Sequence, residues 1–135
     1  MQTSTGTIPL FTEVGGLIKS RLQHGLSLPF SQCQTLWFVA EHKRPNMQDV
    51  AKHFKITAPS ATFLVEELVH GGHLIRHASS ADRRKVELVL TPKGKQVVRV
   101  LIQKRKVVLN KIFESLSSAD RNDLNRILKK ILTNA

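Results

Sequence analysis

The sequence predicts a mainly α-helical fold with one small β-hairpin. Apolar residues recur at helical spacing, three and four positions apart, over most of the 135-residue chain. Residues 74–90 break this pattern, because two short apolar or β-branched runs there flank a polar turn. With 41% apolar residues the chain can bury one core, so we expect a single domain over residues 1–135.

The first two helices are expected over residues 7–25 and 31–42. Thr7 is predicted to cap the first helix, and Pro9 falls in the first turn, where proline is tolerated. Residues 26–29 break the apolar repeat, and Ser31 is predicted to cap the second helix.

The next two helices lie close together in the sequence. A short helix is predicted over residues 47–54, and Thr57 is predicted to cap another that Gly71-Gly72 ends near residue 70. Two helices joined by a turn of about four residues form the pattern of a helix-turn-helix. The hairpin that follows at once is therefore interpreted as a wing.

Two further helices follow the hairpin. Thr91 is predicted to cap a long helix that Pro92 opens, and Ser117 with Asp120 is predicted to form a capping box before the last helix. The first, fifth and sixth helices carry more apolar surface than so small a core can cover. We therefore expect a homodimer through these helices; the alternative is that they fold back on the chain's own core.

The charge balance predicts a polyanionic partner. The chain has 21 Lys and Arg residues against 10 Asp and Glu, a net charge of +11. Such a partner is most often nucleic acid and less often an acidic membrane surface. No apolar run reaches the roughly 20 residues of a membrane span, and the first residues do not form a secretion signal. We therefore expect a soluble, cytoplasmic protein.

Catalytic, metal and redox chemistry are not expected. The sequence has no Gly-rich phosphate loop, nucleophile elbow or paired carboxylates, so we expect neither an enzyme nor a cofactor. Its six histidines lack ligand spacing, and the pair His70 and His73 spans a helix end, so no metal site is predicted. The single cysteine, Cys33, is interpreted as a buried, inert thiol.

Motifs in the hairpin and in the preceding helices match a known family. The wing motif is the most specific: Arg76, then Asp82-Arg83-Arg84 six residues later, then a strand that ends in Leu90-Thr91-Pro92-Lys93-Gly94. Asp49-Val50-Ala51 and Pro59-Ser60-Ala61-Thr62 support it. From about residue 8 to residue 132, the chain resembles the MarR family of winged-helix transcription regulators.

The resemblance implies a homodimeric, DNA-binding transcription regulator, expected to be a repressor. Residues 8–25 and 92–134 would form the dimerisation helices, and residues 30–91 the winged helix-turn-helix lobe. Helix 57–70 would enter the major groove of a pseudo-palindromic duplex, and the wing, residues 74–90, an adjacent minor groove. Release by a small aromatic anionic effector, or by an oxidant, is also implied.

Four residues of helix 57–70 are predicted to contact DNA. Thr57, Ser60 and Thr62 lie at its amino end, where hydroxyls and free N–H groups can hold phosphates or read base edges. Phe63 departs from the family pattern, in which Arg is common. Because this helix has no Lys or Arg, we expect Phe63 to contact thymine methyls and the site to be rich in A·T pairs. The alternative for Phe63 is packing against the core or a second subunit.

The wing supplies the cations of the predicted interface. Arg83, Arg84 and Lys85 form its tip, and Arg84 matches the family position that enters the minor groove. Narrow A·T-rich minor grooves attract such an arginine. Arg76 and Asp82 are predicted to orient the tip, since a carboxylate in the hairpin can pair with a guanidinium.

Two other functions remain open from the sequence. A basic protein could bind nucleic acid through charge alone, and a helix 57–70 without cations is compatible with that function. A winged helix can also serve as a protein-interaction module whose basic face binds an acidic partner.

Overall fold

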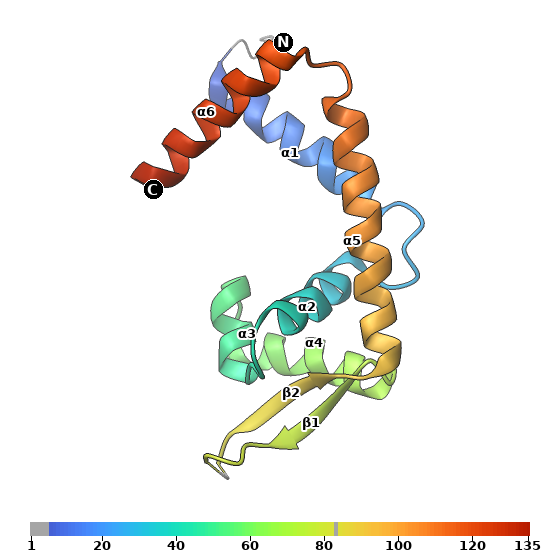
Figure 1. Ribbon diagram of the computed structural model, residues 1–135. Helices are drawn as coiled ribbons and strands as arrows, with labels where there is room; N and C mark the ends of the chain where they lie inside the picture. Colours follow the sequence, from blue (N-terminus) through green and yellow to red (C-terminus); the bar gives the residue numbers. More distant parts are fainter. Residues whose placement is uncertain (1–5, 83) are drawn as a thin grey trace. The chain divides into compact units, whose positions relative to one another are not determined.

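The computed structural model describes residues 6–82 and 84–135 and confirms the mainly α-helical fold with a β-hairpin (Figure 1). None of the helices in these ranges is both long and apolar enough to cross a membrane. The elements are α1 (Thr7–Gln23), α2 (Phe30–Glu41), α3 (Met47–Phe54), α4 (Ala58–His70), β1 (Leu74–Ala78), β2 (Val86–Leu90), α5 (Pro92–Phe113) and α6 (Ser118–Asn134).

The chain divides into two compact units. One comprises the described residues up to Leu22 together with Lys104–Ala135, and the other comprises Gln23–Gln103. The boundary therefore falls within α5, which contributes to both units. The second unit contains the helix-turn-helix and the hairpin.

One apolar core holds this second unit together. Every element from α2 to the first half of α5 contributes a fully or nearly fully buried side chain to it. Removal of this surface from water is the main favourable contribution to folding. The buried side chains are Leu36, Phe38, Val39, Val50, Ala61, Val65, Leu68, Leu74, Leu88 and Val98.

The helix-turn-helix begins and ends where the sequence predicts. The hydroxyl of Thr57 accepts a hydrogen bond from the Ser60 N–H at 3.3 Å and so caps α4. Asn46 and Asp49 form a reciprocal capping box at the start of α3, which the sequence analysis missed. Helix α3 ends at Phe54, and the next residue, Lys55, has a left-handed backbone (φ 54°) that turns the chain toward α4.

Two predicted helix starts differ from the structure. Helix α2 begins at Phe30, because the Pro29 carbonyl accepts the N–H groups of Gln32 and Cys33 at 3.0 and 3.1 Å. The predicted Ser31 cap is therefore wrong. Helix α1 begins at Thr7 itself, one residue earlier than a Thr7 cap would allow, and ends at Gln23.

The hairpin is antiparallel and is fixed to the chain between α2 and α3. Leu74 pairs with Leu90, and the register continues to Ala78 opposite Val86. The Leu88 N–H donates to the Pro45 carbonyl at 2.8 Å, beside a single β-bridge between Asn46 and Glu87. The core side of the wing therefore has a fixed position against the start of α3.

A compact joint connects the end of α4 to the start of α5. The Thr91 hydroxyl accepts from the Gly94 N–H at 3.1 Å, as a helix cap, and donates to the Gly72 carbonyl at 2.6 Å. The Thr91 N–H donates to the His73 carbonyl at 3.1 Å. A Cβ atom on Gly94 would lie 2.2 Å from that same carbonyl oxygen, so only glycine fits there. We call residues 71–73 and 91–94 the Thr91 joint.

We expect Gly94→Ala to lower the free energy of unfolding by about 2–4 kcal/mol, because the new methyl group would collide with backbone. Chemical denaturation measures this change. The control is Gly16→Ala in α1, where nothing lies within 4 Å of the added Cβ. That variant should gain up to about 1 kcal/mol from helix propensity. Equal stability of the two variants would contradict the close approach at Gly94.

His73 occupies a buried position in the Thr91 joint. Its side chain is 6% exposed, and among the described residues nothing hydrogen-bonds to its Nδ1 atom. Burial lowers the pKa of His73 below its ordinary value of 6.5, and the nearby charge of Lys93 lowers it further. The folded chain therefore favours the neutral imidazole.

We expect stability to fall as the pH drops below about 6.5, because the unfolded His73 then binds a proton that the folded His73 resists. Above that pH this contribution is fully present. His73→Leu removes the titrating group, so the variant should not lose this stability. The unfolding free energy of the variant minus that of the parent should therefore rise as the pH falls from 7.5 to 5.5. A difference that does not change with pH would show that His73 titrates alike in both states.

Candidate nucleic-acid interface

Helix α4 separates its residues between the core and the solvent. Ala61, Val65 and Leu68 are buried, whereas the side chain of Phe63 is 69% exposed. Packing of Phe63 against the core of its own chain is therefore excluded. An aromatic side chain left so exposed is available to contact another molecule.

Hydroxyl groups surround the amino end of α4. Thr57, Ser60 and Thr62 are all exposed. The Thr57 hydroxyl donates to Ser60 Oγ at 2.9 Å, and the Thr62 hydroxyl donates to the Ala58 carbonyl at 3.0 Å. These bonds fix the hydroxyls in position, while their oxygens can still accept hydrogen bonds.

An ion pair joins α4 to the hairpin. The guanidinium of Arg76, in β1, pairs with the carboxylate of Glu66. A second ion pair joins Arg44 to Glu87 of β2 at 3.3 Å. Arg76 is thus directed at the helix, which differs from the predicted pairing with a carboxylate of the hairpin.

Side-chain to backbone hydrogen bonds order the tip of the wing. The Ser79 hydroxyl oxygen accepts the N–H groups of Ala81 and Asp82 at 3.3 and 3.4 Å. Asp82 Oδ1 accepts the Arg84 N–H at 3.0 Å. Ser79 is 9% exposed, and its position agrees with the turn-forming role expected of a serine at the start of a polar loop. Arg83 lies outside the described residues.

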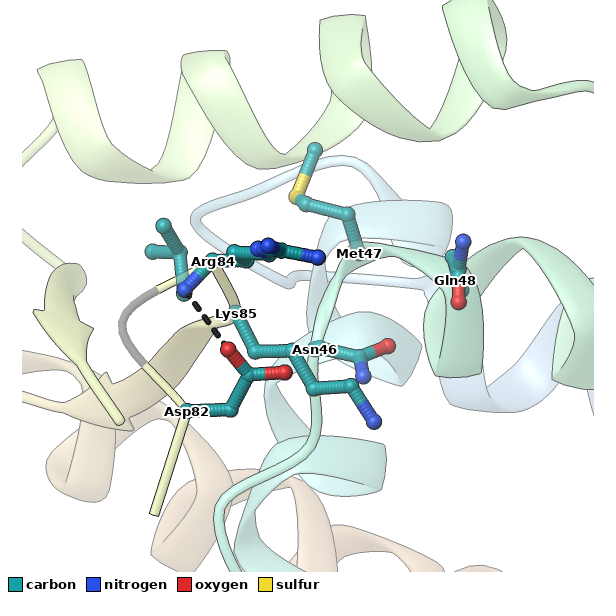
Figure 2. A pocket seen from close by; sticks show the side chains of 7 residues that line it. Asn46, Met47, Gln48, Asp82, Arg84 and Lys85 are labelled. Atoms are coloured by element: carbon teal, nitrogen blue, oxygen red, sulfur yellow. Dashed lines mark hydrogen bonds between the residues drawn. The ribbon is translucent and has the colours of Figure 1, made fainter. Parts of the chain in front are cut away.

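A hollow of about 440 Å³ lies between the wing and the start of α3 (Figure 2). Arg84 and Lys85 extend into it from the wing, with the carboxylate of Asp82 beside them. The hollow also carries uncharged polar and apolar groups, which charge patterns in the sequence could not indicate. We call it the wing hollow; its remaining lining residues are Asn46, Met47, Gln48 and Val86.

The other candidate chemistries gain no support from the geometry. No group of three His, Cys, Asp or Glu side chains within residues 6–82 and 84–135 could hold a metal ion. Cys33 is 1% exposed, with its sulfur 3.7 Å from the Leu28 carbonyl. The elements together define a winged helix-turn-helix protein. Helices α3 and α4 form the helix-turn-helix, the basic hairpin that follows forms the wing, and a capped helix comes next.

Comparison with known proteins finds a similar family and similar transcription regulators. The model of the MarR family matches residues 24–85, so the chain is similar to this family over the helix-turn-helix and most of the wing. The transcriptional repressor MprA of Escherichia coli is 31% identical over 74 residues, which are 55% of this chain and 42% of that protein. The match thus spans less than half of the E. coli relative. The regulator YfiV of Bacillus subtilis is 27% identical over 82% of this chain and 71% of its own length.

Solved structures share the fold over nearly the whole chain. MepR, a transcription regulator of the Staphylococcus aureus multidrug efflux pump MepA, aligns with a TM-score of 0.81 and 19% identity. That alignment covers 96% of this chain and 98% of MepR. A MepR–DNA complex aligns with a TM-score of 0.77 at 19% identity, over 98% of this chain and 99% of that one. At this level of identity the likeness concerns the fold.

Proposed function

We propose that the chain is a homodimeric DNA-binding repressor of transcription. Helix α4 enters the major groove, and the wing enters an adjacent minor groove. The observation that carries this proposal is that Phe63 and three hydroxyl side chains are exposed together at the amino end of α4. They lie next to an ordered wing that bears Arg84 and Lys85.

The major-groove contacts combine hydroxyl and apolar chemistry. The Ser60 hydroxyl donates to a phosphate or a base edge, and the hydroxyl oxygens of Thr57 and Thr62, whose own protons are used within α4, accept hydrogen bonds at base edges. Phe63 contacts thymine methyls. Since α4 has no Lys or Arg, the preferred site is rich in A·T pairs. The carboxylate of Glu66 on α4 would repel DNA phosphates. Its ion pair with Arg76 offsets part of this negative charge, which favours entry of α4 into the groove.

The minor-groove contact relies on Arg84. Its backbone N–H is held by Asp82, so the residue leaves the hairpin in a fixed direction. A guanidinium in a narrow A·T-rich minor groove interacts with concentrated negative potential and displaces counterions. Lys85 adds a contact to the phosphate backbone.

The relatives support DNA binding and its regulation by a ligand. MepR has been solved in complex with DNA, and 6-hydroxynicotinic acid regulates DNA binding by BpsR of Bordetella bronchiseptica. BpsR aligns with a TM-score of 0.74 at 22% identity, over 97% of this chain and 96% of BpsR. We propose that a small aromatic anion likewise releases this protein from DNA.

Exposed apolar side chains on α1 and α6 support the homodimer. Phe11 of α1 is 71% exposed, and Ile131 and Leu132 of α6 are 54% and 76% exposed. Isolated chains rarely leave such stripes uncovered. A twofold dimer would bury them and present two copies of α4 about one turn of DNA apart, roughly 34 Å.

We expect Arg84→Ala to weaken binding to A·T-rich duplexes about tenfold and to lower the magnitude of the salt slope by about 1, because one counterion-releasing contact is lost. Gel-shift titrations at several salt concentrations measure both quantities. Lys129→Ala, which removes an exposed cation of α6, is the control with the same loss of charge. Equal effects of the two variants would refute the minor-groove position of the wing.

We expect Ile131→Lys to convert the dimer into a monomer, because a charge would be buried at the apolar stripe. Sedimentation equilibrium measures the mass, and circular dichroism monitors the helices. Asn122→Lys adds the same charge half a helical circumference away and should remain dimeric. A parent protein that is monomeric at micromolar concentration would refute the dimer outright.

A further inference from the structure

We propose that His42 and His53 form a binding site for a divalent transition-metal ion, Cu²⁺ or Zn²⁺, which links the end of α2 to the end of α3. Water molecules complete its coordination, because no group of three His, Cys, Asp or Glu side chains within residues 6–82 and 84–135 could hold a metal ion. The site is independent of the proposed contacts with DNA. The sequence analysis missed it, since the two histidines lie at the ends of different helices.

Two phenylalanine rings hold the imidazoles close together. The buried ring of Phe38 lies 4.1 Å from the His42 ring and 4.4 Å from the His53 ring, centre to centre. Phe54 packs edge-on against His53 at 4.7 Å, and the centres of the two imidazoles are 6.1 Å apart. A zinc–nitrogen bond of about 2 Å puts the centre of a bound imidazole roughly 3.2 Å from the ion, so two rings on one ion lie about 5–6.5 Å apart. The observed separation falls within this range.

The hydrogen bond of His42 leaves one of its nitrogens free to bind a metal ion. Its Nδ1 atom lies 2.8 Å from the Phe38 carbonyl oxygen. A carbonyl oxygen only accepts, so Nδ1 carries the proton and Nε2 of the neutral ring keeps its lone pair. An imidazole whose other nitrogen donates to a carbonyl is typical of histidines that bind metals. The ring nitrogens of His53 have no hydrogen-bond partner among residues 6–82 and 84–135.

The ends of two helices make this position favourable for a cation. His42 is the C-cap of α2, and His53 lies in the last turn of α3. The carbonyl ends of helices carry partial negative charge, which stabilises a nearby cation. Both imidazoles are exposed, so an ion can reach them from solvent. Imidazole nitrogen is a preferred ligand of Cu²⁺ and Zn²⁺, whereas Mg²⁺ prefers oxygen.

Copper binding can be followed through Trp37, the single tryptophan of the chain, because it lies in α2 close to His42 and Cu²⁺ quenches nearby tryptophan fluorescence. We expect Cu²⁺ to quench Trp37 saturably, and excess Zn²⁺ but not Mg²⁺ to reverse the quenching. His53→Phe keeps an aromatic ring against Phe38 but removes the ligand nitrogen. We therefore expect its copper affinity to fall by at least about tenfold. Circular dichroism monitors whether the variant is folded.

The matched control is His77→Phe. His77 is also exposed, and its Nδ1 lies 2.9 Å from the Ala78 carbonyl oxygen, but it belongs to β1 rather than to either helix. His42→Phe repeats the test from the other side of the pair. Weaker copper binding in both variants of the pair, with parental affinity in His77→Phe, is the expected result. If the parent shows no saturable quenching, or if His53→Phe and His77→Phe bind copper equally well, the metal site is wrong, whatever the DNA-binding experiments show.

Discussion

The hydroxyl of Thr91 makes the contact on which the arrangement of the winged helix depends. It accepts from the Gly94 N–H and donates to the Gly72 carbonyl, so one side chain caps α5 and holds the end of α4. The wing leaves and re-enters the core between these two points, at Leu74 and Leu90. The direction of α4 and the base of the wing are therefore set together, and the missing side chain at Gly94 allows the backbones to approach.

The tip of the wing is ordered by a different kind of interaction. Its shape comes from hydrogen bonds that the hydroxyl of Ser79 and the carboxylate of Asp82 accept from backbone N–H groups. Exposed ion pairs, in contrast, join its strands to neighbouring segments. Exposed ion pairs contribute little and weaken with salt. The hydrogen bonds keep the tip in shape when salt screens its charges, so a change in salt acts on contacts with DNA more than on the wing itself.

Much of this fold could be predicted from local patterns. The caps Thr57, Thr91 and Ser117, the bounds of α3 and α4, and the strands of the hairpin each follow from residues within one turn or one pair of strands. The failures involve groups that meet only in three dimensions. Arg76 pairs with Glu66 because β1 packs beside α4, which the sequence does not specify. The wing hollow joins residues about 40 positions apart, and those on α3 carry no charge that could reveal them.

The exposure of Phe63 has a thermodynamic consequence for the proposed interface. The contacts of Arg84 and Lys85 depend on displaced counterions and so vanish progressively with ionic strength. Burial of an aromatic ring against thymine methyls depends on the release of water from apolar surface, which carries a negative heat-capacity change and little salt dependence. The two halves of the interface would thus respond to different variables: the wing to ionic strength, and α4 to temperature.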